Sequence, residues 1–243
     1  MTTSRNVGPK IAMASITKRE DITSDLWKVW LRPDVPFNFK PGQYCTIGLN
    51  GLERPYSIVS SPKEKLIELF IELIPPPLGV LTPLLHEAKE GDIVTIRPRA
   101  KGLFTFKEEY DFHVMISTVT GVAPFVSMVR NYLRNPSEKD NFLILEGASY
   151  IDEFGYDEEL QEIASKHENI KYIPTCSRPE DPKNKNWRGE KGRVNNILSK
   201  YVDSGLNSKN TLIYACGHPE MVNDVKRQIS DEFNFIEERF WKS

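Results

Sequence analysis

The 243-residue sequence has only three cysteines, Cys45, Cys176 and Cys216, and they lie far apart along the chain. They form no C-x-x-C group, so neither a local zinc knuckle nor a plant-type iron–sulfur cluster can be assembled from them. An odd number of cysteines also fits a reducing compartment, in which thiols stay free. The sequence therefore predicts no metal site, and any iron–sulfur partner must be a separate protein.

Long hydrophobic runs are also absent. No apolar run approaches the roughly 20 residues that would span a bilayer, and residues 1–10 lack the apolar stretch of a signal peptide. We therefore expect a cytoplasmic protein with no membrane span. The formal net charge of -2 gives no reason to expect a nucleic-acid partner. The histidines form no cluster: they are His86, His113, His167 and His218.

Short runs rich in β-branched and aromatic residues fill the chain from residue 11 to about residue 99. Apolar and polar residues alternate in these runs with the period of half-buried strands. Examples are residues 27–31, 43–47, 66–72 and 93–97. Several such strands at this spacing predict a small antiparallel β-barrel.

After residue 106 the rhythm changes, and strand-like runs alternate with segments of helix length. This alternation is typical of a parallel sheet covered by helices. We predict a domain boundary near residues 107–111, which divides the chain into 1–107 and 108–243. The predicted strands are 112–117, 141–148, 170–176 and 211–215, and the predicted helices are 124–133, 155–166, 193–201 and 219–232.

One segment of the first half carries groups that suit a flavin and its diphosphate. The tetrapeptide Arg54-Pro55-Tyr56-Ser57 lies at the start of a predicted strand. Arg54 can clamp a diphosphate through two hydrogen bonds, Tyr56 can stack on or beside an isoalloxazine ring, and Ser57 can hydrogen-bond the region of flavin N5.

Two later segments each run from the end of a predicted strand to the start of a predicted helix. Residues 117–125, Ser-Thr-Val-Thr-Gly-Val-Ala-Pro-Phe, contain Thr120 and Gly121 in the context that a phosphate-binding turn requires. Residues 216–221, Cys-Gly-His-Pro-Glu-Met, begin with Cys216 and Gly217. The carboxyl end of a parallel strand favours a ligand site at this point.

The order and spacing of these motifs resemble the ferredoxin-NADP reductase superfamily over nearly the whole chain, and most of all its bacterial ferredoxin (flavodoxin)-NADP reductases. The resemblance implies an FAD-binding antiparallel barrel, an NADP(H)-binding α/β domain, and electron transfer between NADPH and a one-electron carrier such as ferredoxin or flavodoxin. It also implies a second flavin segment, in which a strand and a helix start offer backbone N–H groups to the pyrophosphate. The matching residues are Ile71, Leu73, Gly79, Leu81 and Thr82, with Thr82 as both helix cap and phosphate ligand.

The resemblance also implies roles around the nicotinamide. In the superfamily the cysteine of the last motif lies against the nicotinamide, so Cys216 would sit where the hydride leaves. Ser57 and a carboxylate of the tail, either Glu237 or Glu238, would lie nearby. The sequence departs from the family at Val119, where most relatives have the first glycine of G-T-G-x-A-P-F. A β-branched residue does not easily adopt the left-handed conformation that glycine adopts in such a turn.

Nucleotide preference depends on residues after the predicted strand 170–176. Relatives that prefer NADP often have Ser and Arg here, which bind the adenosine 2′-phosphate. Ser177 and Arg178 occupy these positions, and Arg193 matches a second arginine of the bacterial enzymes. An NAD-preferring enzyme more often carries an acidic residue near this point, and Glu180 and Asp181 leave that alternative open. We favour NADPH.

The tail carries adjacent aromatic residues, Phe240 and Trp241, which need a flat or apolar surface to cover. Similar tails of bacterial ferredoxin reductases stack on FAD, so we expect both residues to contact FAD, with their assignment to its rings left open.

The partner and two alternative functions complete the expectations. A basic stretch of Arg97, Arg99, Lys101 and Lys107, close to the expected flavin, would suit an acidic ferredoxin or flavodoxin. We expect a monomer. The first alternative is an NADH-dependent reductase component of an oxygenase or cytochrome system. The second is a non-catalytic flavin electron-transfer subunit, for which Val119 is the only support.

Overall fold

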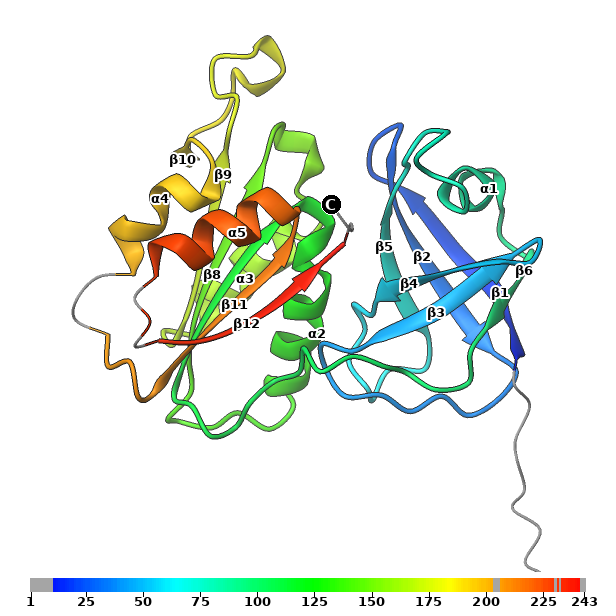
Figure 1. Cartoon of the computed structure of the whole chain (residues 1–243), viewed down its shortest axis with the longest axis horizontal. Helices are drawn as coiled ribbons and strands as arrows, with labels where there is room; N and C mark the ends of the chain where they lie inside the picture. The colour runs from blue at the N-terminus through cyan, green and yellow to red at the C-terminus, as the bar shows by residue number, and fades with distance from the viewer. Residues whose placement is uncertain (1–10, 203–205, 230, 232, 241–243) are drawn as a thin grey trace, which may run out of the picture.

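The computed structural model describes residues 11–202, 206–229, 231 and 233–240. The chain forms two six-stranded sheets that stand side by side, with α2 between them (Figure 1). One sheet is antiparallel and the other is parallel, which confirms the predicted fold class.

The first sheet has the order β4-β3-β6-β1-β2-β5. A bridge between Ile58 and Leu69 joins the end of β4 to β5, so the two edges of the sheet meet and nearly close a barrel. Trp27 and the other apolar side chains inside this barrel half form one buried cluster. Its elements are β1 (Ala12–Asp21), β2 (Leu26–Pro33), β3 (Tyr44–Leu49), β4 (Leu52–Ser57), β5 (Ile67–Glu72), α1 (Thr82–Glu87) and β6 (Ile93–Ile96).

The second sheet has the order β10-β9-β8-β7-β11-β12, and its neighbouring strands run parallel. Its central strands are buried along nearly their whole length, as expected of a sheet covered on both faces. The strands are β7 (Phe112–Thr118), β8 (Asn141–Ala148), β9 (Ile170–Cys176), β10 (Glu190–Lys191), β11 (Thr211–Gly217) and β12 (Asn234–Arg239).

Helices cover both faces of this second sheet. The apolar residues of α4 (Val194–Tyr201) and α5 (Pro219–Gln228) pack on one face. Those of α2 (Ala123–Tyr132) and α3 (Asp157–Lys166) pack on the other face. The apolar cluster beneath α2 and α3 also includes Leu26, Val59, Phe70 and Phe104 from the barrel half, so the two halves share one apolar core. The division of the chain at residue 107 stays a prediction.

The sequence and the structure differ most at the C-terminal end. The chain after α5 adds a sixth strand, β12, beside β11, where the sequence analysis expected only a tail. The sequence does not indicate this strand, because Glu237, Glu238 and Arg239 are charged and all of its residues are exposed or partly buried. The alternation typical of a half-buried strand is therefore absent. The helix expected over 219–232 ends at Gln228, and residues 230 and 232 lie outside the described part of the chain. Among the described residues, no helix is long and apolar enough to cross a membrane.

A buried carboxyl group lies inside the second sheet. Glu146 on β8 is fully buried; its Oε2 accepts a hydrogen bond of 2.7 Å from the Tyr172 hydroxyl, and its Oε1 has no partner among the described residues. Burial raises the pKa of Glu146 to about 8, against the opposing effect of the Tyr172 hydrogen bond. The folded protein therefore holds a proton here that the unfolded chain releases at neutral pH.

This proton predicts a pH dependence of stability. Because the folded pKa is raised, the stabilisation is complete at acidic pH and is lost as the pH rises toward about 8. The contribution to the slope is at most about 1.4 kcal/mol per pH unit. Glu146→Gln imitates the protonated carboxyl, so urea unfolding between pH 5 and 8 should show a flatter dependence, whereas the exposed control Glu162→Gln should retain the wild-type slope. An unchanged slope in Glu146→Gln would contradict this account.

Candidate active site

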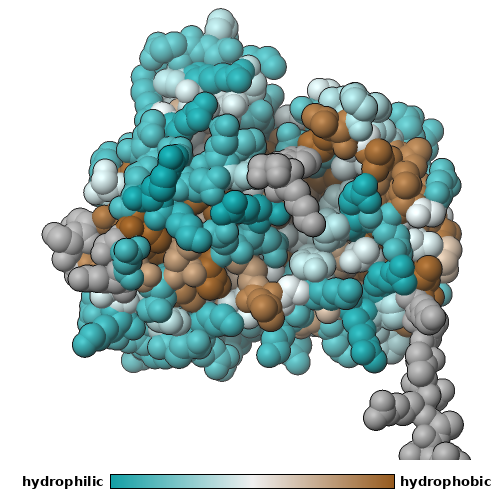
Figure 2. Space-filling model, viewed as in Figure 1, coloured by the Kyte–Doolittle hydropathy of each residue, from teal (hydrophilic) through white to brown (hydrophobic). Residues whose placement is uncertain are grey.

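A cleft of about 320 Å³ lies where the two halves meet. Figure 2 shows apolar side chains on the upper part of the barrel half, beside this boundary. Most of the residues expected to hold a cofactor line the cleft: Arg54, Pro55, Tyr56, Ser57, Ile71, Gly79, Leu81, Thr82, Thr120 and Phe240. Leu73 does not line it and packs against the barrel core.

The tetrapeptide 54–57 forms the end of β4, whereas the sequence analysis placed it at the start of a strand. The reason is a tight turn before it: Asn50 and Gly51 both have positive φ, at 52° and 81°, and such a pair starts a new hairpin strand at Leu52. The Arg54 side chain is exposed, and within the described part of the chain its Nη1 donates to the Glu53 carbonyl alone, at 2.7 Å. Its guanidinium is therefore available to an anionic group in the cleft.

The start of α1 corrects one of the two roles expected for Thr82, that of helix cap, and its role as a phosphate ligand stays a prediction. Leu81, and not Thr82, is the N-cap of this helix. The Thr82 hydroxyl donates to the Ile74 carbonyl at 3.1 Å and accepts from the Ile74 N–H at 3.0 Å, so it closes the loop between β5 and α1. A Cβ at Gly79 would lie 1.7 Å from the Ile74 carbonyl oxygen, which explains glycine in this tight loop.

Strand β12 brings a carboxylate from the second half to the end of β4. The Ser57 hydroxyl donates a 2.8 Å hydrogen bond to Glu238 Oε1. Glu238 is also the register partner of Cys216 on β11, so Ser57, Cys216 and Glu238 lie together. Glu237 does not join them, because its carboxylate pairs with Lys226 at 3.4 Å and with Arg239 at 2.7 Å.

Burial controls the protonation of these groups. It raises the pKa of Glu238, against the opposing hydrogen bond from Ser57. Burial also raises the pKa of the Cys216 thiol, and the nearby Glu238 charge adds to this effect. The thiol is fully buried and does not line the cleft. Cys216 therefore lacks the thiolate that a nucleophile needs, and its contact with a nicotinamide stays a prediction.

The carboxyl ends of β7 and β11 meet on the side of the cleft that the second half forms. The turn η1 (Val119–Val122) leads from β7 into α2, and the Thr118 Oγ1 before it accepts a 3.1 Å hydrogen bond from the His218 N–H after β11. Gly121 is required by packing, since a Cβ there would lie 2.3 Å from the Cys216 carbonyl oxygen. Gly217 has a φ of 128°, and its carbonyl accepts from the Phe240 N–H at 3.3 Å.

Val119 adopts the left-handed conformation that the sequence analysis considered difficult for it, with a φ of 43°. A β-branched residue with positive φ is strained, and such strain is found most often at functional sites. Val119 therefore holds, at a cost in strain, a positive φ that glycine would adopt freely.

Replacing Val119 tests this strain. Val119→Gly and Val119→Ala both remove the packed side chain, but only glycine accepts a positive φ freely. We expect Val119→Gly to be more stable than Val119→Ala by about 1 kcal/mol, measured by chemical unfolding. An alanine variant equal to or more stable than the glycine variant would show that residue 119 is not left-handed in solution.

The residues expected to bind the adenosine lie farther along the carboxyl edge of the second sheet, after β9 and before α4. The Gly192 N–H donates to the Cys176 carbonyl at 2.8 Å, which brings the chain segments of Arg178 and Arg193 side by side. Both arginines are exposed. Arg178 Nη1 donates to the Tyr150 hydroxyl at 2.7 Å.

Other side chains around this point were not anticipated. Lys183 Nζ lies 4.7 Å from the centre of the Tyr150 ring, so Lys183 and Arg178 both contact one aromatic residue. The two acidic residues that left NADH open are engaged elsewhere. Glu180 lies 3.5 Å from Lys191, and the Asp181 carboxylate accepts from the Lys183 backbone N–H at 2.9 Å.

One expected residue cannot be placed, and two residues of the cleft were not expected. Trp241 lies outside the described residues. The sequence analysis missed Tyr44 and Glu72, which line the cleft. Burial raises the pKa of Glu72 to about 7, and the charges of Asp25 and Glu153 add to the effect. Nothing in the local pattern distinguishes these two residues from ordinary strand positions.

Comparisons with known proteins agree with this architecture. Residues 115–227 match the family described as the oxidoreductase NAD-binding domain. Protein RfbI of Salmonella typhimurium is 28% identical over 221 residues, which cover 90% of this chain and 63% of that protein. The sulfhydrogenase 1 subunit gamma of Pyrococcus furiosus is 32% identical over 193 residues, which cover 78% of this chain and 62% of that protein. The chain thus spans less than two thirds of the length of these two relatives.

A third relative and a solved structure match over nearly full length. The flavodoxin/ferredoxin–NADP reductase of Buchnera aphidicola subsp. Schizaphis graminum is 26% identical over 232 residues, which cover 87% of each chain. The ferredoxin NADP⁺ reductase from Neisseria gonorrhoeae with bound FAD and NADP has a TM-score of 0.78 at 21% identity, and the match covers 96% of this chain and 100% of that one.

These matches and the two-sheet fold confirm the resemblance found in the sequence. Over most of its length the chain is similar in sequence to a flavodoxin/ferredoxin–NADP reductase, it shares the fold of a ferredoxin NADP⁺ reductase, and residues 115–227 match the oxidoreductase NAD-binding domain.

Proposed function

We propose that this protein is an NADPH-dependent FAD oxidoreductase that exchanges electrons with a one-electron carrier. The observation that carries the proposal is the cleft between the two halves, where the end of β4 meets the turn before α2 and the end of β12. Each of these three segments bears a motif of the superfamily, and they are brought together from positions far apart in the sequence.

The residues of the cleft fit a flavin dinucleotide. The exposed Arg54 guanidinium has no acidic partner among the described residues and suits a diphosphate. Tyr56 and Phe240 supply aromatic surface, and Ser57 and Glu238 supply a hydroxyl and a carboxyl at one point of the wall. When bound, FAD accepts a hydride and releases two single electrons, and the side chains around it bind, orient and exclude water.

The nucleotide would lie along the carboxyl edge of the parallel sheet, which is where ligands bind in open α/β sheets. The turn 119–122 would meet its pyrophosphate. Arg178, Arg193 and Lys183 offer three cationic groups at the other end, and both nearby acidic residues have other partners. This balance of charge supports NADPH over NADH, because only NADPH carries a 2′-phosphate.

The carrier would dock beside the barrel side of the cleft. Arg99 and Lys101 are exposed, and Lys101 pairs through its backbone with Tyr44, which lines the cleft. Arg97 takes less part than expected, since it forms a 2.6 Å ion pair with Glu53. An acidic ferredoxin or flavodoxin suits this surface, and charge complementarity would act mainly on the rate of association.

An anaerobic titration tests the proposed function. Protein loaded with FAD is titrated with NADPH and, separately, with NADH, while the absorbance band of the oxidised flavin is followed. We expect bleaching at a low excess of NADPH and at a much higher excess of NADH. Bleaching by NADH alone would favour a reductase component that uses NADH, and a flavin that neither nucleotide bleaches would favour a non-catalytic electron-transfer subunit.

Two arginines test the nucleotide preference. Arg178→Ala with Arg193→Ala should raise the KM for NADPH about 10-fold or more, the loss of one or two charge-assisted hydrogen bonds, and should leave the KM for NADH nearly unchanged. Arg188→Ala is the control, because this arginine of the same loop lines a different hollow, together with Tyr172 and Tyr201. Equal losses with both nucleotides would refute the assignment.

A further inference from the structure

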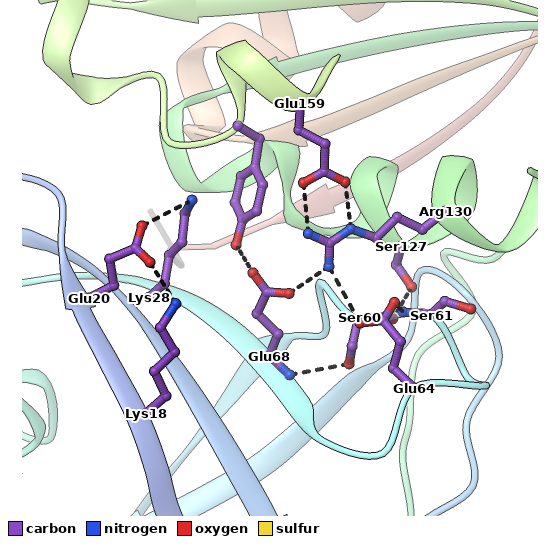
Figure 3. Close-up of polar contacts among 11 residues, drawn as sticks. Lys18, Glu20, Lys28, Ser60, Ser61, Glu64, Glu68, Ser127, Arg130 and Glu159 are labelled. Carbon is purple, nitrogen blue, oxygen red and sulfur yellow. Dashed lines mark hydrogen bonds and ion pairs between the residues drawn. The ribbon is translucent and has the colours of Figure 1, made fainter. Parts of the chain in front are cut away.

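An ion pair between a buried carboxylate and a partly buried arginine joins the two halves of the molecule. Glu68, on β5 of the barrel half, is only 3% exposed, and its Oε2 lies 2.5 Å from Nη1 of Arg130 on α2. The other carboxylate oxygen of Glu68 accepts a 2.8 Å hydrogen bond from the Tyr156 hydroxyl, just before α3. Figure 3 shows the carboxylate of Glu68 pointing from the barrel half toward the helices of the other half.

Arg130 is held in a single orientation by a second carboxylate. Its Nε and Nη2 donate to the two oxygens of Glu159 on α3, at 2.6 and 2.7 Å. Such paired, parallel hydrogen bonds fix the plane of a guanidinium as well as its position. The remaining nitrogen, Nη1, therefore points at Glu68 and contacts Glu64 at 3.7 Å (Figure 3).

The face of α2 that carries Arg130, and the turn after the helix, make two further polar contacts with the barrel half. The Ser127 hydroxyl donates to the Ser60 carbonyl at 2.8 Å, and Arg134 Nε donates to the Ser61 hydroxyl at 3.1 Å. Ser127 and Arg130 are three residues apart and share one face of the helix, and Arg134 follows two residues after its end. A row of directional bonds thus fixes where α2 lies along the edge of the barrel half.

Both elements of the ion pair also build the cleft. Strand β5 lines the cleft with Phe70 and Ile71, which follow Glu68 by two and three residues, about 7 to 10 Å along a strand. Seven residues before Arg130, again about 10 Å along a helix, α2 begins at Ala123 in the opposite wall. Phe70, between these points, lines the cleft and packs edge-on against Tyr156, with ring centres 5.5 Å apart.

We propose that Glu68 and Arg130 are positioning residues for hydride transfer. Their ion pair holds α2 against β5 and so sets the distance and angle between the flavin wall and the nucleotide wall of the cleft. The proposal rests on the function proposed above. A hydride passes only between closely aligned atoms, and a displacement of about 1 Å can reduce a rate about 100-fold.

A role in stability alone does not explain this pair. Burying two charges removes them from water, and apolar residues of similar size are often equally or more stabilising. An apolar contact allows sliding, whereas the bonds of Glu68 and Arg130 are directional. Stability and alignment can therefore be separated by experiment.

The test compares variants of the FAD-loaded protein by rapid mixing with NADPH. Glu68→Ala removes the Glu68–Arg130 ion pair. Glu68→Gln removes the charge but keeps the size and shape of the side chain, and it serves if the alanine variant does not fold. We expect the limiting rate of flavin reduction to fall about 10-fold or more, while the Kd for NADPH and the flavin spectrum stay unchanged. Hydrogen exchange at residues 70–72 and 120–123 should become faster, which reports the loosened walls without reference to activity.

Two controls separate alignment from stability. Tyr132→Phe removes buried hydrogen bonds at the C-terminal end of α2, to the Ser137 carbonyl and to Asn169, and both lie in the second half. Its reduction rate should stay within about twofold of the wild type. The double variant Glu68→Met with Arg130→Met should regain stability as an apolar contact and still reduce the flavin slowly.

The outcomes are distinct. An unchanged limiting rate in both Glu68 variants, or a loss of the same size in Tyr132→Phe, would overturn the positioning role. A double variant that recovers the wild-type rate with its stability would do so as well. If the wild-type protein binds FAD but NADPH does not reduce it, the proposed function fails instead, and the exchange measurement still reports whether the pair joins the two walls.

Discussion

The contact between the two halves is the constraint on which the site depends, because each half supplies only part of the cleft. The barrel half brings the end of β4 and the loop before α1, and the other half brings the turn before α2 and the end of β12. A shared apolar cluster makes the contact favourable, but apolar contacts alone do not fix a register. The directional bonds do so: Ser57 with Glu238, Ser60 with Ser127, and Glu68 with Arg130.

Strand β12 shows how topology serves this contact. In a parallel sheet all carboxyl ends lie at one edge, so a last strand beside β11 ends at the same edge as the turn 119–122. Alternation along the strand then sends neighbouring carboxylates to opposite sides. Glu238 reaches Ser57 across the boundary, and Glu237 pairs with Lys226 on α5. A shift of one residue would exchange their places.

The sequence predicted the elements whose signal is local. Strands 141–148 and 170–176 agree with β8 and β9 to the residue, because each is a mainly apolar run between polar loops, and β8 is buried along nearly its whole length. Tertiary relations were harder. The choice between Glu237 and Glu238 needed the register of β12, and the hydroxyl of Thr82 was assigned to a helix cap because its contact with Ile74 is not visible in a helix-start pattern. The Glu68–Arg130 pair joins residues 62 positions apart, which no local pattern indicates.

The contact between the two halves also affects the pKa values of carboxyl groups in the cleft. Glu72 and Glu238 both have raised pKa values because the two halves shield them from water. A ligand that fills the cleft would displace more water and raise these values further. A carboxyl with a raised pKa stays protonated, and can donate a hydrogen bond, over a wider pH range, whereas the arginines that would hold phosphates are exposed. Each half thus contributes a shielded carboxyl to the cleft and keeps these arginines in exposed positions.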